Sequence, residues 1–302
     1  MKERIAEAAA KSVETLLADD AGTSAFRDGQ LLWSLSHLWD QPRYRRLAEQ
    51  VAEGSERDEA AVRGSLVLAE GLAACGYWER ARTLVLQCLA RCDAADYVGE
   101  SPEGQPMPKG ARCLDDWAQV LSVCTRLLHV RADRELQIAA ARAVATILNC
   151  HYHPDLGGVL FAVRGDFFHF DEYWGTCVDS EAALVALTAM LDEAGRRGET
   201  HLSALVGRYL RQHVEAAWDP IEGGIRREYS ADVWSAEKPG AVQAAAVGAL
   251  ATLHRYQGGD WAAEWLDRVR DYQRNCPTDP FTELRCLVRC TREPNEKLDI
   301  VK

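Results

Sequence analysis

The stretches HPDLGG at residues 153–158 and WDPIEGG at residues 218–224 repeat nearly the same phrase within one chain. Each follows a segment of helical periodicity and precedes an aromatic-rich stretch and a second helical segment. The Gly-Gly pair begins at residue 157 and again at residue 223, and self-similarity at a fixed spacing is typical of repeat architecture. We interpret the phrases as equivalent connections in successive helical hairpins, with residues 96–117 as a degenerate third copy; the alternative is two unrelated helix-end turns.

Helical periodicity extends over nearly the whole chain and predicts about twelve helices. Strand-like sequence is confined to residues 157–170 and 224–234, and we expect each of these segments to form a short β-hairpin. The expected helices cover residues 2–19, 25–39, 42–53, 57–74, 77–92, 113–129, 133–150, 177–192, 198–217, 240–256, 260–275 and 280–291.

The expected helices are of two alternating kinds. One kind is amphipathic and rich in Arg and Glu, as in YWERARTLVLQCLARC, and the other is apolar or small on all sides, as in GAVQAAAVGALATLHRY. A helix that is apolar all round is buried all round. The alternation therefore predicts an inner ring of helices surrounded by an outer ring.

The connections between the two kinds differ in length. Links from inner to outer helices are short, whereas three links from outer to inner helices are long, at residues 93–112, 151–176 and 218–239. Long loops within a compact domain are usually functional. In a double ring all three emerge at the face where the inner helices begin, so we expect them to surround the mouth of a central funnel.

Composition limits the partners of this 302-residue chain. Its net charge of −11 disfavours nucleic acid, because phosphate binding requires basic patches. No run of eighteen apolar residues is present, which argues against a membrane partner, and the charged N-terminal segment does not resemble a secretory signal. We expect a cytoplasmic protein with a small-molecule substrate, and leave a homodimer open.

The ten cysteines and the known motifs do not point to a cofactor. No C-x-x-C pair occurs, and Cys88/Cys92 and Cys286/Cys290 have the spacing of one helix face, so we interpret the cysteines as small buried hydrophobes. No GxGxxG, GxxxxGK[ST] or HExxH motif occurs, so we expect neither a nucleotide cofactor nor a metal. The chain also lacks the DxDD motif of protonation-initiated terpene cyclases.

The phrases HPDLGGVLF…EYWGTCVDSEAALVAL and WDPIEGGIRREY…VWSAEKPGAVQAAAVGAL resemble the six-hairpin (α/α)6 toroids. The similar families are the N-acylglucosamine 2-epimerases and the helical barrel of thioredoxin-domain-containing proteins, and the resemblance covers residues 110–256 best. It implies an all-α (α/α)6 toroid over residues 1–302 as a single domain, with short β-hairpins in the crossover loops. The epimerases use inner-helix histidines as acid and base, whereas His129 and His254 here fall near helix C-termini and His151, His153 and His169 in a crossover.

The residues at the starts of the inner helices and in the long crossovers are the candidates for chemistry. We expect Glu181 and His169 to act as acid and base, with Asp116 orienting or protonating the substrate. Asp115 and Asp179 could instead cap their helices. The substrate-binding candidates are Asp28, Trp117, Arg164, Phe168, Tyr173, Trp174, Asp179, Arg227, Tyr229, Trp234, Lys238 and Gln243, the tryptophans as stacking walls and Arg164 or Arg227 as the group that holds an oxygen.

These residues favour a cofactor-independent epimerase or isomerase that acts on a sugar or polyol-like substrate by proton transfer. Two alternatives stay open. One is a cyclase or lyase that acts on a terpenoid or other natural product, which the many aromatic residues favour. The other is a helical-repeat binding protein without catalytic activity.

Overall fold

The computed structural model describes residues 25–36, 38, 42–54, 62–97, 99, 107–171, 173–230 and 234–274, with residues 7, 10, 11 and 13. Helices 2–19 and 280–291 of the sequence prediction lie almost wholly outside these residues. The described α-helices are α2 (Ala25–Ser36), α3 (Pro42–Gly54), α4 (Val62–Ala74), α5 (Trp78–Cys92), α6 (Leu114–Val130), α7 (Arg134–Thr146), α8 (Ser180–Arg197), α9 (Thr200–Ala217), α10 (Gly240–Gln257) and α11 (Asp260–Gln273).

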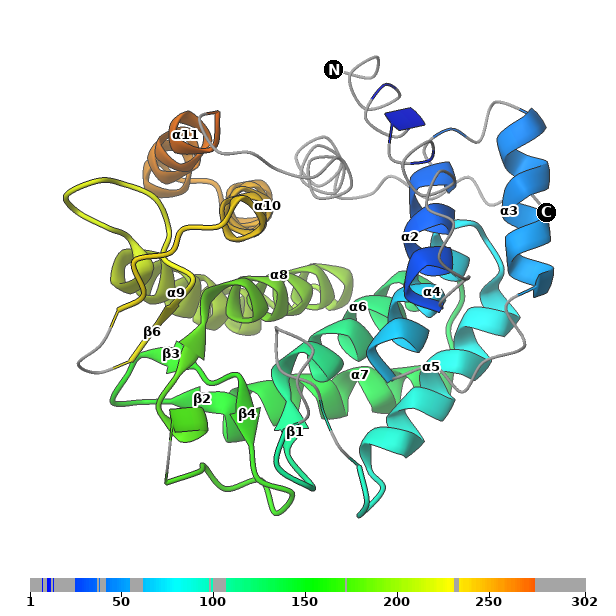
Figure 1. Cartoon of the computed structure of the whole chain (residues 1–302), viewed down its shortest axis with the longest axis horizontal. Helices are drawn as coiled ribbons and strands as arrows, with labels where there is room; N and C mark the ends of the chain where they lie inside the picture. The colour runs from blue at the N-terminus through cyan, green and yellow to red at the C-terminus, as the bar shows by residue number, and fades with distance from the viewer. Residues whose placement is uncertain are drawn as a thin grey trace.

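The even-numbered helices form an inner layer and the odd-numbered helices an outer layer (Figure 1). Each inner helix packs against the next inner helix along the chain, from α2 through α4, α6 and α8 to α10. Each outer helix packs on the inner helix that precedes it in the sequence. The double layer expected from the alternating helix types is confirmed, and the fold is an all-α toroid.

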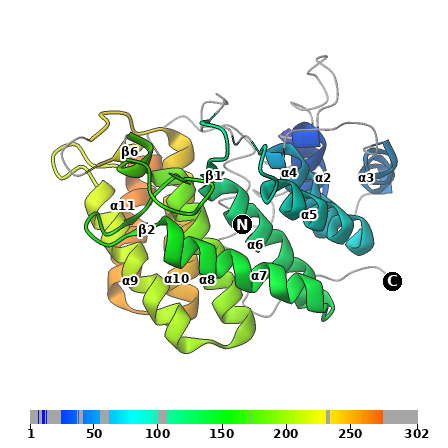
Figure 2. The same cartoon turned by 90° about the horizontal axis from the view of Figure 1, so that it is seen from below.

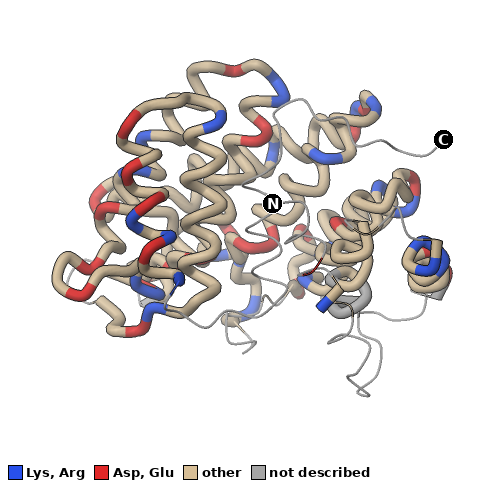
Figure 3. Tube along the Cα trace, turned by 90° about the horizontal axis from the view of Figure 1, so that it is seen from above, with Lys and Arg blue, Asp and Glu red and all other residues tan. Residues whose placement is uncertain are grey.

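Burial separates the two layers as their sequences predict. The inner helix α8 buries twelve of its eighteen residues, whereas the outer helix α11 buries only Ala262 and Val269 of its fourteen. An inner helix is covered by neighbours on both sides and by an outer helix, so polar side chains are excluded from most of its surface. Acidic and basic residues are interspersed along the outer helices and the loops (Figure 3).

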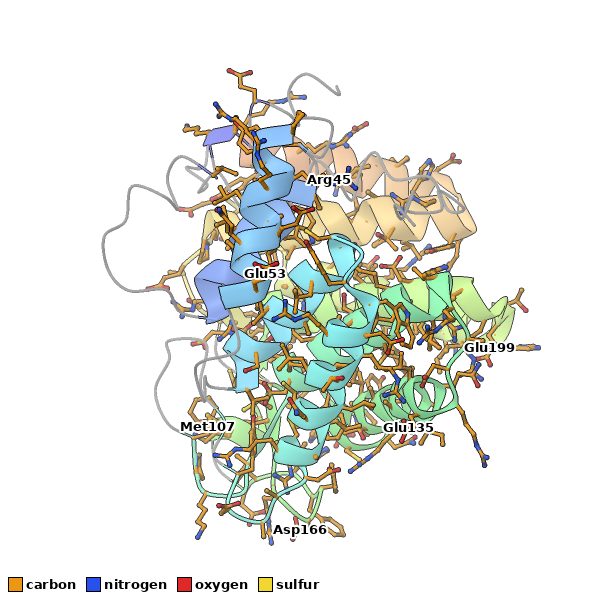
Figure 4. The ribbon with its side chains drawn as sticks, turned by 90° about the vertical axis from the view of Figure 1, so that its right-hand side faces the viewer. Arg45, Glu53, Met107, Glu135, Asp166 and Glu199 are labelled. Carbon is orange, nitrogen blue, oxygen red and sulfur yellow. The ribbon has the colours of Figure 1, made fainter. Side chains whose placement is uncertain are left out.

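The long crossovers gather at one end of the helices. In Figure 2 the strands β1, β2 and β6, which belong to the three crossovers, lie together at the upper end of the inner helices. Figure 4 shows Met107 and Asp166, from two crossovers, at its lower left and at its bottom, and Glu135 and Glu199, near the starts of α7 and α9, toward its right. We call the end with the crossovers and the inner-helix starts the mouth.

Six two-residue strands tie the crossovers together. β2 (Tyr152–His153) pairs with β3 (Gly158–Val159), β1 (Arg112–Cys113) with β4 (Ala162–Val163), and β5 (Val178–Asp179) with β6 (Glu228–Tyr229). The prediction that residues 157–170 form their own hairpin is wrong, because β3 pairs with β2 and β4 pairs with β1, which leads into α6. Residues 224–234 do turn back on themselves through the antiparallel bridge Tyr229↔Trp234, and β6 pairs in addition with β5, which leads into α8.

The two repeated phrases have equivalent structures with an offset of 66 residues. The pair Arg112↔Val163 corresponds to Val178↔Tyr229, and Tyr152↔Val159 corresponds to the bridge Trp218↔Ile225. The hydrogen bond from Leu114 N to Phe161 O (2.7 Å) corresponds to that from Ser180 N to Arg227 O (2.8 Å). The helix starts follow the same offset, from Leu114 to Ser180 and from Arg134 to Thr200. We call residues 112–177 and 178–243 the first and second unit.

Two different demands explain the Gly-Gly pair of the first unit. Gly157 has a φ of +61°, in the left-handed region that glycine adopts at low cost. Gly158 has no such dihedral, but a Cβ atom there would lie 2.7 Å from the Tyr229 hydroxyl and 2.8 Å from a Val178 methyl. The close approach of β3 to the β5–β6 pair therefore requires a residue without a side chain.

The beginning of α8 lies later than the sequence suggests. Residues 178–179 form β5, and Asp179 is the N-cap, accepting a hydrogen bond from Ala182 N at 2.8 Å. The helix then extends to Arg197 and ends at Gly198, which has a φ of +68°. The predicted helix 177–192 is therefore shifted toward the C-terminus.

The seven described cysteines have free thiols and are buried or half-buried. Burial raises the pKa of Cys75, Cys88 and Cys124 to about 12 in each case. These cysteines therefore behave as the small buried hydrophobes that we expected. No helix in the described ranges is long and apolar enough to cross a membrane.

We predict that Gln243→Ala destabilises the protein by about 2–4 kcal/mol, because it leaves the buried backbone N–H and C=O groups of Ile225 without their hydrogen-bond partners. Gln243 is fully buried at the start of α10; its Oε1 accepts from Ile225 N (2.9 Å) and its Nε2 donates to Ile225 O (2.7 Å). Urea unfolding measures the change. The control Gln137→Ala removes an exposed glutamine from α7 and should stay within about 0.5 kcal/mol of the wild type. Equal stabilities for the two variants would contradict this role.

Candidate functional site

Charged side chains from three successive inner helices meet at the mouth. Arg63 in the first turn of α4 forms an ion pair with Asp115 in the first turn of α6 at 3.3 Å. Asp115 and Glu181, in the first turn of α8, both lie close enough to Asp179 to raise the pKa of its carboxyl group, and Arg227 lies close enough to lower it. The convergence of inner-helix starts that we expected is therefore present for α4, α6 and α8.

Asp179 is the buried member of this group. Its side chain is 6% exposed, and burial, followed by the charges of Asp115 and Glu181, raises its pKa to about 7. Its Oδ1 accepts the capping hydrogen bond from Ala182 N, so the capping role is confirmed. Its Oδ2 has no hydrogen-bond partner among the described residues and is not closed off from solvent. Asp179 can therefore hold a proton near neutral pH and present it at the mouth.

Asp115 and Glu181 occupy equivalent positions in the two units. Glu181 is exposed and Asp115 is half-buried. Neither is an N-cap residue: the cap of α6 is Cys113, whose side chain makes no capping hydrogen bond, and the cap of α8 is Asp179. The alternative that Asp115 caps its helix is therefore wrong. One half-buried and one exposed carboxylate therefore lie close to one buried carboxyl group.

Asp116 and Trp117 point away from this group. Asp116 is 5% exposed and accepts a hydrogen bond from the Tyr97 hydroxyl, and its charge helps burial to raise the pKa of Cys92 in the outer helix α5. Trp117 is 1% exposed, with the Arg142 guanidinium of the outer helix α7 over its ring at 5.4 Å. Both side chains pack between α6 and its outer neighbours, which argues against catalysis by Asp116 and stacking by Trp117.

His169 is held within its own crossover. Its Nε2 lies 2.9 Å from Cys150 O, and its ring stacks on His153 with centroids 5.0 Å apart. Neither contact joins His169 to the carboxyl group at the inner-helix starts. The structure therefore does not bring the expected pair, Glu181 and His169, together through a direct contact.

The turn at residues 164–168 presents an aromatic ring to solvent. Arg164 donates to Asp166 at 2.8 Å, and Arg164 N donates to Phe168 O at 2.8 Å. Phe167 has a φ of +66°, a strained value for a residue with a side chain, and lies 6.4 Å from the Trp117 ring. Phe168 is 70% exposed, so the turn holds this ring outward.

The candidate residues in the crossover at residues 218–239 have three different environments. Arg227 donates to Glu237 at 3.1 Å and is half-buried at the mouth, and Trp234 is 52% exposed. Tyr229 is 4% exposed and hydrogen-bonds to His213 at 2.9 Å, so it is closed to a substrate. Lys238 forms ion pairs of 2.8 Å with Asp219 and with Glu222, which ties it to its own crossover.

The remaining candidates are structural or lie outside the description. The side-chain amide of Gln243 is engaged in hydrogen bonds with the backbone of Ile225, so it is not available to bind a substrate. Trp174 is half-buried against Phe161, with centroids 6.2 Å apart. The side chains of Asp28 and Tyr173 are outside the described residues.

Sequence reasoning missed Arg63 and His213. The helix that contains Arg63 was expected to begin at residue 57, which placed Arg63 beyond the first turn, but α4 begins at Val62. His213 lies in the outer helix α9, whereas the candidates predicted from the sequence lie at inner-helix starts and in crossovers. The offset of 66 residues, applied position by position, would have pointed to it, because His213 stands where the first unit has Ile147.

No group of three or more His, Cys, Asp or Glu side chains in the described ranges is arranged to hold a metal ion. The charged groups at the mouth are the carboxyl groups of Asp115, Asp179 and Glu181 and the guanidinium groups of Arg63 and Arg227.

Comparison with known proteins identifies the fold. No protein-family model matches the sequence, and no curated protein matches it. Among solved structures, the chain is similar to a cellobiose 2-epimerase from Bacillus thermoamylovorans (TM-score 0.72, 12% identity, 89% of this chain and 88% of that one). It is also similar to a D-mannose isomerase (TM-score 0.68, 10% identity, 88% of this chain and 86% of that one). A third similar structure is an unsaturated glucuronyl hydrolase from Bacillus sp. (TM-score 0.67, 12% identity, 98% of this chain and 98% of that one).

We predict that Asp179→Asn gains stability relative to the wild type as pH rises from 4 to 8, by up to about 4 kcal/mol. Because the folded pKa of Asp179 is about 7 and its usual value is 3.8, its stabilising contribution is full below pH 4 and is lost as pH rises through 7. Asparagine keeps the cap but does not titrate. Urea unfolding at both pH values measures the difference.

Asp219→Asn is the control. The hydrogen bond from Lys238 holds the pKa of Asp219 below its usual value of 3.8, so the stabilising contribution of Asp219 is lost only below pH 4, and the stability of this variant relative to the wild type should hardly change between pH 4 and pH 8. A difference between Asp179→Asn and the wild type that does not change between pH 4 and pH 8 would contradict the raised pKa.

Proposed function

We propose that this protein is an enzyme that acts on a carbohydrate by acid/base proton transfer, with Asp179 as the group that carries the proton. The observation that carries the proposal is a buried carboxyl group with a pKa of about 7 at the mouth, next to the carboxylates of Asp115 and Glu181. An acid/base catalyst works best when its pKa is near the working pH. Neighbouring carboxyl groups in different environments can divide the acid and base roles.

The structural neighbours support a carbohydrate as the substrate class. They include proteins described as a cellobiose 2-epimerase, a D-mannose isomerase and an unsaturated glucuronyl hydrolase, and each covers most of this chain. We favour epimerisation or isomerisation, in which a proton is removed from a carbon atom and returned. In this proposal the carboxylate of Asp115 or Glu181 removes the proton from the carbon atom, protonated Asp179 returns a proton to it, and exchange with solvent restores both groups. Arg63 and Arg227 hold substrate oxygens.

Hydrolysis of a glycosidic bond is the second candidate. The observation that favours it is the composition of the group at the inner-helix starts, which contains carboxyl groups and no histidine among the described residues. Glycosidases commonly use a pair of carboxyl groups, one of which has a raised pKa.

A sugar panel in D2O separates the two candidates. Cellobiose, D-mannose and an unsaturated glucuronyl disaccharide are incubated with the protein and followed by NMR. Epimerisation or isomerisation places deuterium on a sugar carbon atom, whereas hydrolysis releases a new sugar without such labelling. Saturable binding without either product would favour the alternative of a binding protein.

We predict that Asp179→Asn lowers kcat on the substrate found in this panel by about 100-fold or more. The amide cannot exchange a proton, although it keeps the helix cap. The wild-type kcat/KM should fall above pH 7 as Asp179 loses its proton. Asp155→Asn changes an exposed residue of the turn before Gly157 and should keep wild-type turnover. Full turnover by Asp179→Asn would refute the assignment.

We predict that Phe168→Ala and Trp234→Ala each raise KM about tenfold while kcat changes less than twofold. Both aromatic rings are exposed at equivalent positions of the two units, 66 residues apart, where a sugar face can stack on them. Ile221→Ala is the control, because Ile221 is 91% exposed in a crossover but offers no ring. Unchanged KM in both aromatic variants would remove them from the substrate site.

A further inference from the structure

The two units differ in chemistry around the start of the inner helix. Four apolar or weakly polar residues of the first unit correspond, 66 positions later, to four polar residues of the second. Cys113, Leu114, Ile147 and Val163 are replaced by Asp179, Ser180, His213 and Tyr229, and all eight side chains are buried. The backbone is equivalent in both units, so packing alone does not require the polar set.

Two of the four polar side chains, those of His213 and Tyr229, contact each other. His213 Nδ1 lies 2.9 Å from the Tyr229 hydroxyl, and their rings are 5.4 Å apart. Tyr229 pairs with Val178 and its neighbour Glu228 pairs with Asp179 in the β5–β6 ladder. The His213–Tyr229 hydrogen bond therefore anchors β6, and through the ladder Asp179, to the outer helix α9.

The His213–Tyr229 pair is neutral at physiological pH. Burial lowers the pKa of His213 to about 4, with the Ser180 backbone opposing the fall, and burial raises the pKa of Tyr229. The charged groups that face Asp179 are Asp115, Glu181 and Arg227. Buried polar groups stabilise less than a well-packed apolar pair, and Ser180 Oγ has no hydrogen-bond partner within the described part of the chain. The buried polar residues of the second unit therefore stabilise the fold less than the apolar residues at the same positions of the first unit.

We infer that His213 and Tyr229 are positioning residues for Asp179: their hydrogen bond fixes β6 against α9 and thereby holds the Asp179 carboxyl group in its buried place at the mouth. The inference rests on the proposed function, because it assumes that the placement of Asp179 matters for proton transfer. The geometry on which it stands is the 2.9 Å hydrogen bond, the register of the ladder and the contrast with the first unit.

The test is a 13C NMR titration of the Asp179 carboxyl group, whose signal is identified by its loss in Asp179→Asn. Tyr229→Phe removes only the hydroxyl group that His213 contacts. We expect the Asp179 midpoint to fall by about one pH unit or more, as the carboxyl group gains solvent. Tyr152→Phe is the matched control, because Tyr152 is a half-buried tyrosine that stacks on Tyr209 at 4.0 Å. It should leave the midpoint unchanged.

The double variant His213→Ile/Tyr229→Val introduces the residues that the first unit has at the same places, so it should fold with a Tm close to that of the wild type. We expect its Asp179 midpoint to fall as in Tyr229→Phe. On the substrate of the panel, kcat should fall about tenfold or more, KM should change less than twofold, and the alkaline limb of kcat/KM should move to lower pH with the midpoint. His213→Gln keeps a hydrogen-bonding group, so its Asp179 midpoint should fall less than that of the double variant.

The outcomes separate the two claims. An unchanged Asp179 midpoint in both Tyr229→Phe and the double variant overturns the inference, whatever the effect on Tm or turnover. A lowered midpoint in a protein that converts no sugar supports the positioning role and refutes the proposed function.

Discussion

The mouth depends on one constraint, the antiparallel pairing of the crossovers at residues 151–176 and 218–239 with the strands that lead into α6 and α8. β4 pairs with β1 directly before α6, and β6 pairs with β5 directly before α8. A strand followed at once by a helix fixes the direction of the first helical turn. The repeated ladders therefore set Asp115 and Glu181 at equivalent positions on neighbouring inner helices, where their charges add to the burial that raises the pKa of Asp179.

The two units share the same backbone structure, and the groups proposed for catalysis lie where their side chains differ. The first unit shows that an apolar set can fill the same backbone, with Cys113 at the cap and no side-chain hydrogen bond to the helix. The second unit places a carboxyl group at that cap, where the unpaired N–H groups of a helix start favour a negative charge but burial disfavours it. The balance leaves the pKa of Asp179 at about 7.

The sequence predicts the layers well because burial on all sides leaves a pattern along each helix. It predicts the site less well because the first turn of a helix has several side chains that point in different directions. Asp115 and Asp116 are adjacent, yet one faces Arg63 at the mouth and the other the Tyr97 hydroxyl. The pairing of β6 with β5 is a contact between residues far apart in the chain, so neither the role of Tyr229 nor that of His213 follows from local sequence.

The most direct test of this account is a crystal structure of the Asp179→Asn variant with the saccharide that the wild-type protein converts. The account predicts that a sugar ring lies at the inner-helix starts, within hydrogen-bond distance of residue 179 and next to Asp115 and Glu181. A saccharide bound at the opposite ends of the inner helices, or only on the outer helices, would contradict it.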